Sequence, residues 1–213
     1  MKFVMSYSCG KDSSLALSKM LEDGHEPVAL LVMFNKNEDR SYFHGVKTDL
    51  LERIVYAINI PVILCPSKGE DYHSAFEKGL KKAMAMGAEF ACFGDIDIEA
   101  NKEWGVTRCR NVGLKWEYPL WQRKRADIVE EIIAKGFKCI IKSLDNRVLP
   151  KELLGEFLNE ETVDIMKKSG IDICGENGEY HTLTVGGPIF KSPVTYEIGE
   201  TLDIGEYSVI DIK

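Results

Sequence analysis

The sequence predicts an α/β protein: a parallel sheet with helices on both faces, followed by a smaller C-terminal α+β domain. Three observations predict this class. Short apolar segments alternate with amphipathic segments along the first half of the chain. The apolar segments are too uniformly hydrophobic for half-exposed strands, which is typical of parallel strands that are buried on both faces. Polar clusters follow three of these segments, and open α/β sheets bind ligands beyond the carboxyl ends of their strands.

The first half of the chain gives its elements in order. Short apolar strands are expected over residues 3–5, 28–34, 61–65 and 90–93. Helices are expected over residues 11–22, 46–59 and 70–86. Apolar residues recur at i, i+3 and i+4 in the second helix, and a glycine follows the first and the third. The polar clusters cover residues 6–14, 35–44 and 94–98.

The second half changes character. We expect a helix over 121–135, a strand over 137–144, a short helix over 160–168, a glycine-rich segment over 175–187 and strands over 189–198 and 207–212. No linker rich in Pro, Gly or Ser separates the halves. We therefore place a soft boundary near Trp121, with a nucleotide-binding domain over residues 1–120 and a substrate-side domain over 121–213.

Composition narrows the function. The 213 residues carry 27 Lys and Arg against 34 Asp and Glu, a net charge of −7, which argues against general nucleic-acid binding. No apolar run approaches the roughly 20 residues that span a bilayer, and the N-terminus lacks the apolar core of a signal peptide. The six cysteines include no C-x-x-C pair, which favours free buried thiols. We expect a cytoplasmic protein with no membrane contact, and self-association is left open.

The segment that joins the first strand to the first helix has the chemistry of a phosphate site. A helix N-terminus offers unpaired N–H groups, small residues let a phosphate approach the main chain, and Lys11 adds a positive charge. Asp12 suits a nucleotide polyphosphate with Mg²⁺ better than a bare anion. The segment is not a Walker A loop, because Met5 stands where its first glycine would fall. The simpler alternative is that Ser8 and Asp12 only cap the helix; the position after the first strand favours phosphate binding.

The same segment resembles the S-G-G-x-D-S signature of PP-loop ATP pyrophosphatases, with Cys9 in place of the second small residue. Further segments, at residues 40–46, 93–96, 119–121, 174–182 and 187–190, resemble the diphthine–ammonia ligase family in the same order. The resemblance covers nearly the whole chain, and it implies a PP-loop domain of the HUP-like, Rossmann-type fold.

The resemblance also implies a reaction. A carboxylate attacks the α-phosphate of ATP, pyrophosphate leaves, and ammonia displaces AMP from the acyl-adenylate to give an amide. In the namesake enzymes the carboxylate belongs to diphthine, a modified histidine of a translation elongation factor. No glutaminase domain is evident, so free ammonium is the expected nitrogen source.

Site residues follow from this comparison. The pyrophosphate side is expected to be held by Ser8, Gly10, Lys11, Asp12, Ser13 and Ser14, with Mg²⁺ on Asp12. The adenosine is expected beside Ser6 and the main chain of Met33 to Asn35, with Gly94 admitting the nucleotide. The acceptor side is expected to be formed by Glu176, Asn177, Glu179, His181 and Thr182. The catalytic set is then Lys11, Asp12, Asp95, a candidate partner for metal or ammonium, and Glu179.

Several interpretations stay open. Trp104 and Trp121 fit interface packing as well as substrate stacking, and His44 fits a structural role as well as an acceptor contact. His181 stands where the family often carries an acidic residue, so another small or protein-bound carboxylate is an alternative acceptor. A PP-loop tRNA thiolase or lysidine-type enzyme is a rival function, and a non-catalytic sensor of adenine nucleotides is a second. The acidic charge and the missing C-x-x-C pair count against the first rival, and Asp12 with its neighbouring carboxylates counts against the second.

Overall fold

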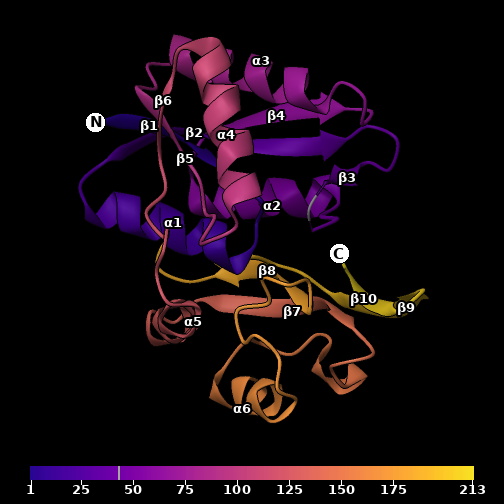
Figure 1. The fold of residues 1–213 in the computed structure, drawn as a ribbon. Coiled ribbons are helices and arrows are strands. Elements are labelled where there is room, and N and C mark those ends of the chain that lie inside the picture. Colours follow the sequence, from indigo (N-terminus) through magenta and orange to yellow (C-terminus); the bar gives the residue numbers. More distant parts are fainter. Residues whose placement is uncertain (43) are drawn as a thin grey trace.

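The computed structural model describes residues 1–42 and 44–213 and contains two sheets with helices around them (Figure 1). The six strands of the first sheet are β1 (Lys2–Ser6), β2 (Glu26–Asn35), β3 (Arg40–Ser41), β4 (Val62–Ser67), β5 (Phe90–Cys92) and β6 (Lys115–Glu117). Strands β4, β2, β1, β5 and β6 lie side by side and run parallel, and the short β3 runs antiparallel to the end of β2. The predicted α/β class is therefore confirmed. Phe43, within the segment 40–46 used for the resemblance, lies outside the described residues.

Helices cover both faces of this sheet, as parallel strands require. One face carries α1 (Lys11–Glu22) and α2 (Thr48–Ile58), and the other carries α3 (Tyr72–Ala85) and α4 (Glu99–Val112) (Figure 1). No helix in the described part of the chain has both the length and the apolar character that crossing a membrane requires.

The second sheet is antiparallel and lies beyond α1 (Figure 1). Its four strands, in the order β8, β7, β10, β9, are β7 (Lys138–Asp145), β8 (Tyr180–Gly186), β9 (Ile198–Ile204) and β10 (Tyr207–Ile212). The remaining helices are α5 (Arg125–Ala134) and α6 (Glu160–Lys168), with a 3₁₀ turn at Lys151–Leu153. A single buried cluster contains Leu15 of α1 together with Ile140 of β7 and Leu183 of β8. The two sheets thus share one core, with α1 between them.

Four expectations about elements were wrong or incomplete. No strand covers residues 189–197; the strand there is β9, which begins at Ile198, and Pro193 within the expected range has no N–H to give a ladder. The glycine-rich segment 175–187 contains β8. The helix expected from residue 121 begins at Arg125, because the chain first turns through Gln122 with a φ of 60°. The short strands β3 and β6 were not anticipated.

Gly79 allows α3 to pack closely on the sheet, and this contact gives a testable prediction. A Cβ at position 79 would overlap Sγ of Cys65 on β4 and lie 3.0 Å from Cδ1 of Leu31 on β2. Ala normally stabilises a helix interior over Gly, but here we expect Gly79→Ala to lower the free energy of unfolding by about 1–3 kcal/mol through overpacking. Chemical denaturation measures this change. The matched control is Lys78→Ala, on the exposed side of the same helix, and an unchanged or raised stability for Gly79→Ala would contradict the packing described here.

Candidate functional site

The loop between β1 and α1 turns sharply to bring the N-terminus of α1 to the edge of the sheet. Cys9 has a φ of 67°, in the left-handed region that favours glycine, and it is fully buried. The carbonyl oxygen of Gly10 accepts hydrogen bonds from the hydroxyls of Ser13 (3.1 Å) and Ser14 (2.9 Å). Ser8 Oγ lies 3.1 Å from Ser13 Oγ and accepts a bond from the Gly10 N–H at 3.3 Å. The loop is thus closed by its own hydroxyl groups, and we call residues 7–13 the phosphate loop.

Strand β8 of the second sheet is hydrogen-bonded to the phosphate loop. The N–H of Lys11 donates to Thr182 Oγ1 at 3.1 Å, and the N–H of Thr184 donates to the carbonyl of Cys9 at 2.8 Å. Thr182 was expected on the acceptor side; it is buried beneath the loop instead and contacts the main chain of α1. The second half of the chain therefore fixes the position of the loop.

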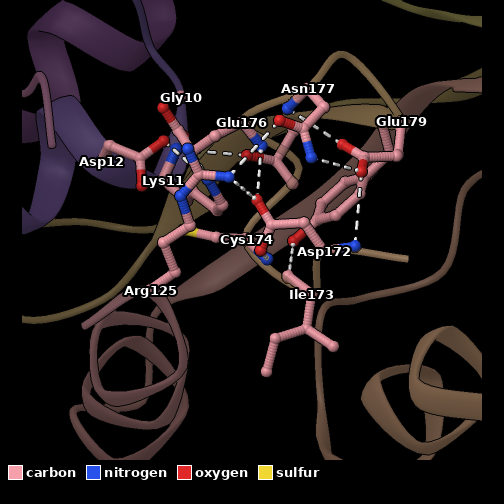
Figure 2. A network of polar contacts seen from close by, with 12 residues as sticks. Gly10, Lys11, Asp12, Arg125, Asp172, Ile173, Cys174, Glu176, Asn177 and Glu179 are labelled. Atoms are coloured by element: carbon pink, nitrogen blue, oxygen red, sulfur yellow. Dashed lines mark hydrogen bonds and ion pairs between the residues drawn. The ribbon is translucent and has the colours of Figure 1, made fainter. Parts of the chain in front are cut away.

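A buried ion cluster lies at the start of α1 (Figure 2). Lys11 Nζ is 2.6 Å from Asp12 Oδ2 and 3.8 Å from Glu176 Oε1, and the Lys11 side chain is 6% exposed. Burial alone would lower the pKa of Lys11, but the Asp12 carboxylate opposes it and the pKa stays well above its usual value. The second oxygen of Asp12, Oδ1, is buried and has no hydrogen-bond partner among the residues that the structure describes. An unpaired buried carboxylate oxygen is costly, so it marks a place for a ligand or a cation.

The loop that follows α6 presents Glu176 to this cluster (Figure 2). Asp172 Oδ2 accepts the N–H of Glu176 at 3.1 Å and pairs with Arg125 at 2.6 Å. Glu179 accepts the N–H of Asp172 (3.3 Å) and the N–H of Asn177 (3.0 Å), together with the Asn177 amide (3.0 Å). The carboxylate of Glu179 is used inside the loop, so Glu179 and Asn177 position Glu176.

A cavity of about 600 Å³ opens beside the phosphate loop at the carboxyl ends of the strands. Its polar wall contains Ser6, Ser8, Asp12, Ser13, Asp95 and Glu176. Its apolar wall contains Met33, Tyr42, Tyr72, Phe76, Phe93 and Trp104. An anionic group with its cation therefore fits one end of this cavity, and a flat ring fits the other.

Most of the aromatic wall escaped the sequence reasoning. Phe76 on α3 packs edge-on against Trp104 on α4, with ring centroids 4.8 Å apart, and Tyr42 packs edge-on against Tyr72 at 4.9 Å. The sequence did offer one signal for this wall: the aromatic pair Tyr72-His73 at the start of the helix that follows the third predicted strand. It was missed because no polar cluster follows that strand. Trp104 lines the cavity, but Trp121 does not; the ammonium of Lys102 lies 4.0 Å from its ring.

Gly94 and Asp95 approach the first turn of α1 from β5. A Cβ at Gly94 would lie 2.9 Å from the nitrogen of Ser13 and 3.0 Å from the carbonyl carbon of Asp12, so the missing side chain admits the helix backbone itself. Burial, with a smaller contribution from Asp12, raises the pKa of Asp95 to about 6. Burial and the Asp12 carboxylate raise the pKa of Glu176 to about 7. Two carboxyl groups that can hold a proton near neutral pH therefore face the cavity.

His44 lies on the other side of the phosphate loop. A Cβ at Gly10 would come within 2.7 Å of His44 Nε2, so glycine admits the ring here. Burial lowers the pKa of His44 to about 3, and its Nδ1 is buried with no partner in the described part of the chain. His181 does not line the cavity, but its ring centroid lies 5.6 Å from that of His44. Partial desolvation and the Lys11 ammonium lower the pKa of His181, an exposed residue, as well, so both imidazoles are neutral at pH 7.

Two further expected residues lie outside the cavity. Asn35 Oδ1 accepts the N–H of Asn37 at 3.0 Å, within its own turn. Ser14 is fully buried in α1, and its hydroxyl lies 3.1 Å from that of Tyr7 as well as bonding Gly10.

The side chains at the polar end can hold a divalent cation. Potential ligand atoms of Asp12, Cys174 and Glu176 lie within 4.8 Å of one another. Burial raises the pKa of Cys174 to about 12, so its sulfur stays a neutral thiol. The donors that remain are carboxylate oxygens, which suit a hard cation, and the unpaired Asp12 Oδ1 is one of them.

Comparison with known proteins agrees with this architecture. The family model described as the diphthamide synthase N-terminal domain matches residues 1–116, and the diphthamide synthase C-terminal domain matches residues 124–212. A curated diphthine–ammonia ligase of Mus musculus is 35% identical, over 95% of this chain and 85% of that protein. The Homo sapiens protein of the same name is 24% identical over the same shares. That of Schizosaccharomyces pombe is 26% identical over 100% of this chain but only 39% of its own length.

Among solved structures, a protein described as a predicted subunit of tRNA methyltransferase from Methanocaldococcus jannaschii aligns over 86% of this chain and 96% of its own. The identity is 13% and the TM-score is 0.47, a likeness too weak to indicate function.

The bonds made by Glu179 predict a positioning role. In Glu179→Gln one acceptor oxygen becomes an NH₂ group, so at least one of the three N–H donors loses its partner, and we expect the free energy of unfolding to fall by about 1–2 kcal/mol. ATP affinity measured without Mg²⁺ should stay within about twofold, while AMP formation with an acceptor falls at least tenfold, because Glu176 is then poorly held. Chemical denaturation measures the stability, titration calorimetry the ATP affinity, and product analysis the AMP formed. The solvent-exposed Glu160→Gln is the control. A collapse of ATP binding would instead give Glu179 a direct part in the nucleotide site.

Proposed function

The chain belongs to the diphthamide synthase family and is an ATP-dependent amide ligase; we propose that it performs the diphthine–ammonia ligase reaction in the cavity beside the phosphate loop. The observation that carries this proposal is the arrangement of Lys11, Asp12 and the first turn of α1 at the polar end of that cavity. The acceptor is the carboxylate of diphthine on a translation elongation factor, which would be met in the cytoplasm.

The triphosphate is assigned to the polar end. Apart from the Lys11 N–H, which donates to Thr182, the first N–H groups of α1 can bind an anion, because they have no acceptors within the helix and the positive end of its dipole favours negative charge. The hydroxyl of Ser8, which accepts the Gly10 N–H, can add a donor, and Lys11 adds a buried charge. These groups would hold the β- and γ-phosphates and stabilise the charge that develops on pyrophosphate as it leaves.

Mg²⁺ fits the carboxylate pair at the same end. Asp12 Oδ1 and Glu176 are the residues that would hold it, because both are oxygen donors and the first is otherwise unpaired. When bound there, Mg²⁺ would neutralise part of the charge on the phosphates. Lys11 keeps the other oxygen of Asp12 oriented.

The adenosine is assigned to the aromatic end, beside Ser6, Met33 and Trp104. The α-phosphate then lies between the two ends of the cavity. The acceptor carboxylate oxygen attacks it, the bond to the β-phosphate breaks, and pyrophosphate leaves. Ammonia next attacks the acyl carbon, the bond to the AMP oxygen breaks, and the surplus proton on nitrogen passes to a carboxylate. Asp95 suits that last role, since its raised pKa of about 6 makes it a better proton acceptor than an ordinary aspartate.

Product analysis tests the function directly. We expect wild-type protein incubated with ATP, Mg²⁺, ammonium and a diphthine-bearing elongation factor to form AMP and pyrophosphate in equal amounts. Asp12→Asn should reduce this rate about 100-fold or more with the fold intact, since it removes charge at the phosphates. Asp127→Asn, an exposed acidic residue in the first turn of α5, is the matched control. ADP and phosphate as products, or undiminished turnover by Asp12→Asn, would contradict the proposal.

The raised pKa of Glu176 predicts the pH dependence of the first step. Glu176 acts as a carboxylate, so protonation below its pKa of about 7 removes the active form. At sub-saturating Mg²⁺, where a proton and the cation compete for this carboxylate, acceptor-dependent pyrophosphate release without ammonium should rise about tenfold per pH unit below pH 7 and level off above it. In Glu176→Gln the residual rate should no longer show this rise below pH 7. A rise with the same midpoint in that variant would assign the ionisation to another group.

A further inference from the structure

A second, positively charged cluster adjoins the phosphate loop on the side of the second sheet. Its centre is Lys142, the extra residue where the pairing of β7 with β8 shifts register between Ile141 and Ser143. Bulges of this kind redirect a side chain and recur beside functional sites. Lys142 has no role in the proposed function.

The ammonium of Lys142 is buried and almost without partners. The residue is 5% exposed, and its one hydrogen bond in the described structure is a long contact of 3.5 Å to the carbonyl of Ile210. An ammonium group has three donors, and a buried charge is costly unless it is paired. Lys142 therefore has unused binding capacity.

The charges around Lys142 are mostly positive. Arg40 and Lys47 act on it with the same sign, and Asp211 is its nearby carboxylate. Asp211 is already engaged by Lys47 at 2.8 Å and by Lys213 at 3.8 Å. Burial, together with these cations, lowers the pKa of Lys142 to about 8, so the group remains largely protonated at pH 7. In a chain with a net charge of −7, this is a local site for an anion.

The cluster connects with the nucleotide cavity through two imidazoles. Ser143, next to Lys142, pairs with His181 across the strands, and the His181 ring packs edge-on against His44. His44 lines the cavity and lies against Gly10 of the phosphate loop. Lys142 is close enough to contribute to the environment of His44. An anion held at Lys142 would thus lie beside the loop, on the side of His44.

Adenylation requires a carboxylate to approach a triphosphate, and both groups are anionic. Lys11 is paired with Asp12 and is already assigned to the phosphates, so the incoming acid needs a second cation. From this geometry we propose that Lys142, with His181 and His44 as neutral hydrogen-bonding partners, binds the carboxylate group of the acceptor. That the bound carboxylate belongs to the acceptor rests on the proposed function; the binding of a carboxylate at Lys142 does not.

A titration with acetate tests the site without turnover. The chain has four histidines, and the imidazole signals of His44 and His181 should shift saturably with acetate at constant ionic strength, set with chloride. His25, which precedes β2 at the opposite ends of the strands, serves as internal control. The shifts should vanish in Lys142→Met and persist in Lys138→Met, an exposed lysine on the same strand whose ammonium lies over Phe157. No shift in the wild type, or equal shifts in Lys142→Met, would overturn the proposal.

Kinetics separates this site from the proposed function. If wild-type protein forms AMP with the diphthine-bearing factor, Lys142→Met should raise the KM for that factor tenfold or more and leave ATP affinity within twofold. Lys142→Arg should recover part of the loss, because it restores the charge. An unchanged KM in Lys142→Met would refute the role of Lys142 with the acceptor. Absence of AMP formation by the wild type would refute the ligase proposal, and the acetate titration would still decide whether Lys142 binds a carboxylate.

Discussion

Two hydrogen bonds between the phosphate loop and β8 hold the functional part of this protein together. The carbonyl of Cys9 and the N–H of Lys11 are both bound by the second sheet, through Thr184 and Thr182. Cys9 has a left-handed conformation, which costs about 1–2 kcal/mol for a residue other than glycine and persists only where its surroundings enforce it. Strand β8 provides that support. The second half of the chain is therefore a structural part of the nucleotide site as well as the source of Glu176.

The charged groups of the site differ in how fully they are paired within the protein. Lys11 is paired with Asp12 and close to Glu176, and this cluster leaves one oxygen of Asp12 free for a cation. Asp95 and Glu176 can hold a proton near neutral pH, as acid–base chemistry at a leaving group or an amine requires. Lys142 is buried with little pairing and is close enough to His44 to act on it electrostatically. The proposed nucleotide and cation thus share one group of charges, and the proposed acceptor has another.

The elements that could be predicted from the sequence are those that local interactions determine. Helix α1 has the expected bounds because its start at Gly10 and its apolar spacing are local, and α6 begins after a capping box of Asn159 and Thr162. Strand β8 was hidden in a glycine-rich segment because its pairing with β7, far away in sequence, makes it a strand. Likewise, the sequence offered both Glu176 and Glu179 as acceptor-side carboxylates. Only the folded loop, with Asp172 and Arg125, leaves Glu176 facing Lys11 and turns Glu179 inward.

The central claim is that the phosphate loop holds the two outer phosphates of ATP, leaving the innermost one open to a carboxylate. A crystal structure with α,β-methylene-ATP and Mg²⁺ tests it most directly, because this analogue cannot be cleaved between its α- and β-phosphates. The account predicts the β- and γ-phosphates on the first-turn N–H groups of α1, between Ser8 and Ser13, with the base against the aromatic wall formed by Phe76 and Trp104. Phosphates bound elsewhere, with no phosphate oxygen at the first turn of α1, would contradict it.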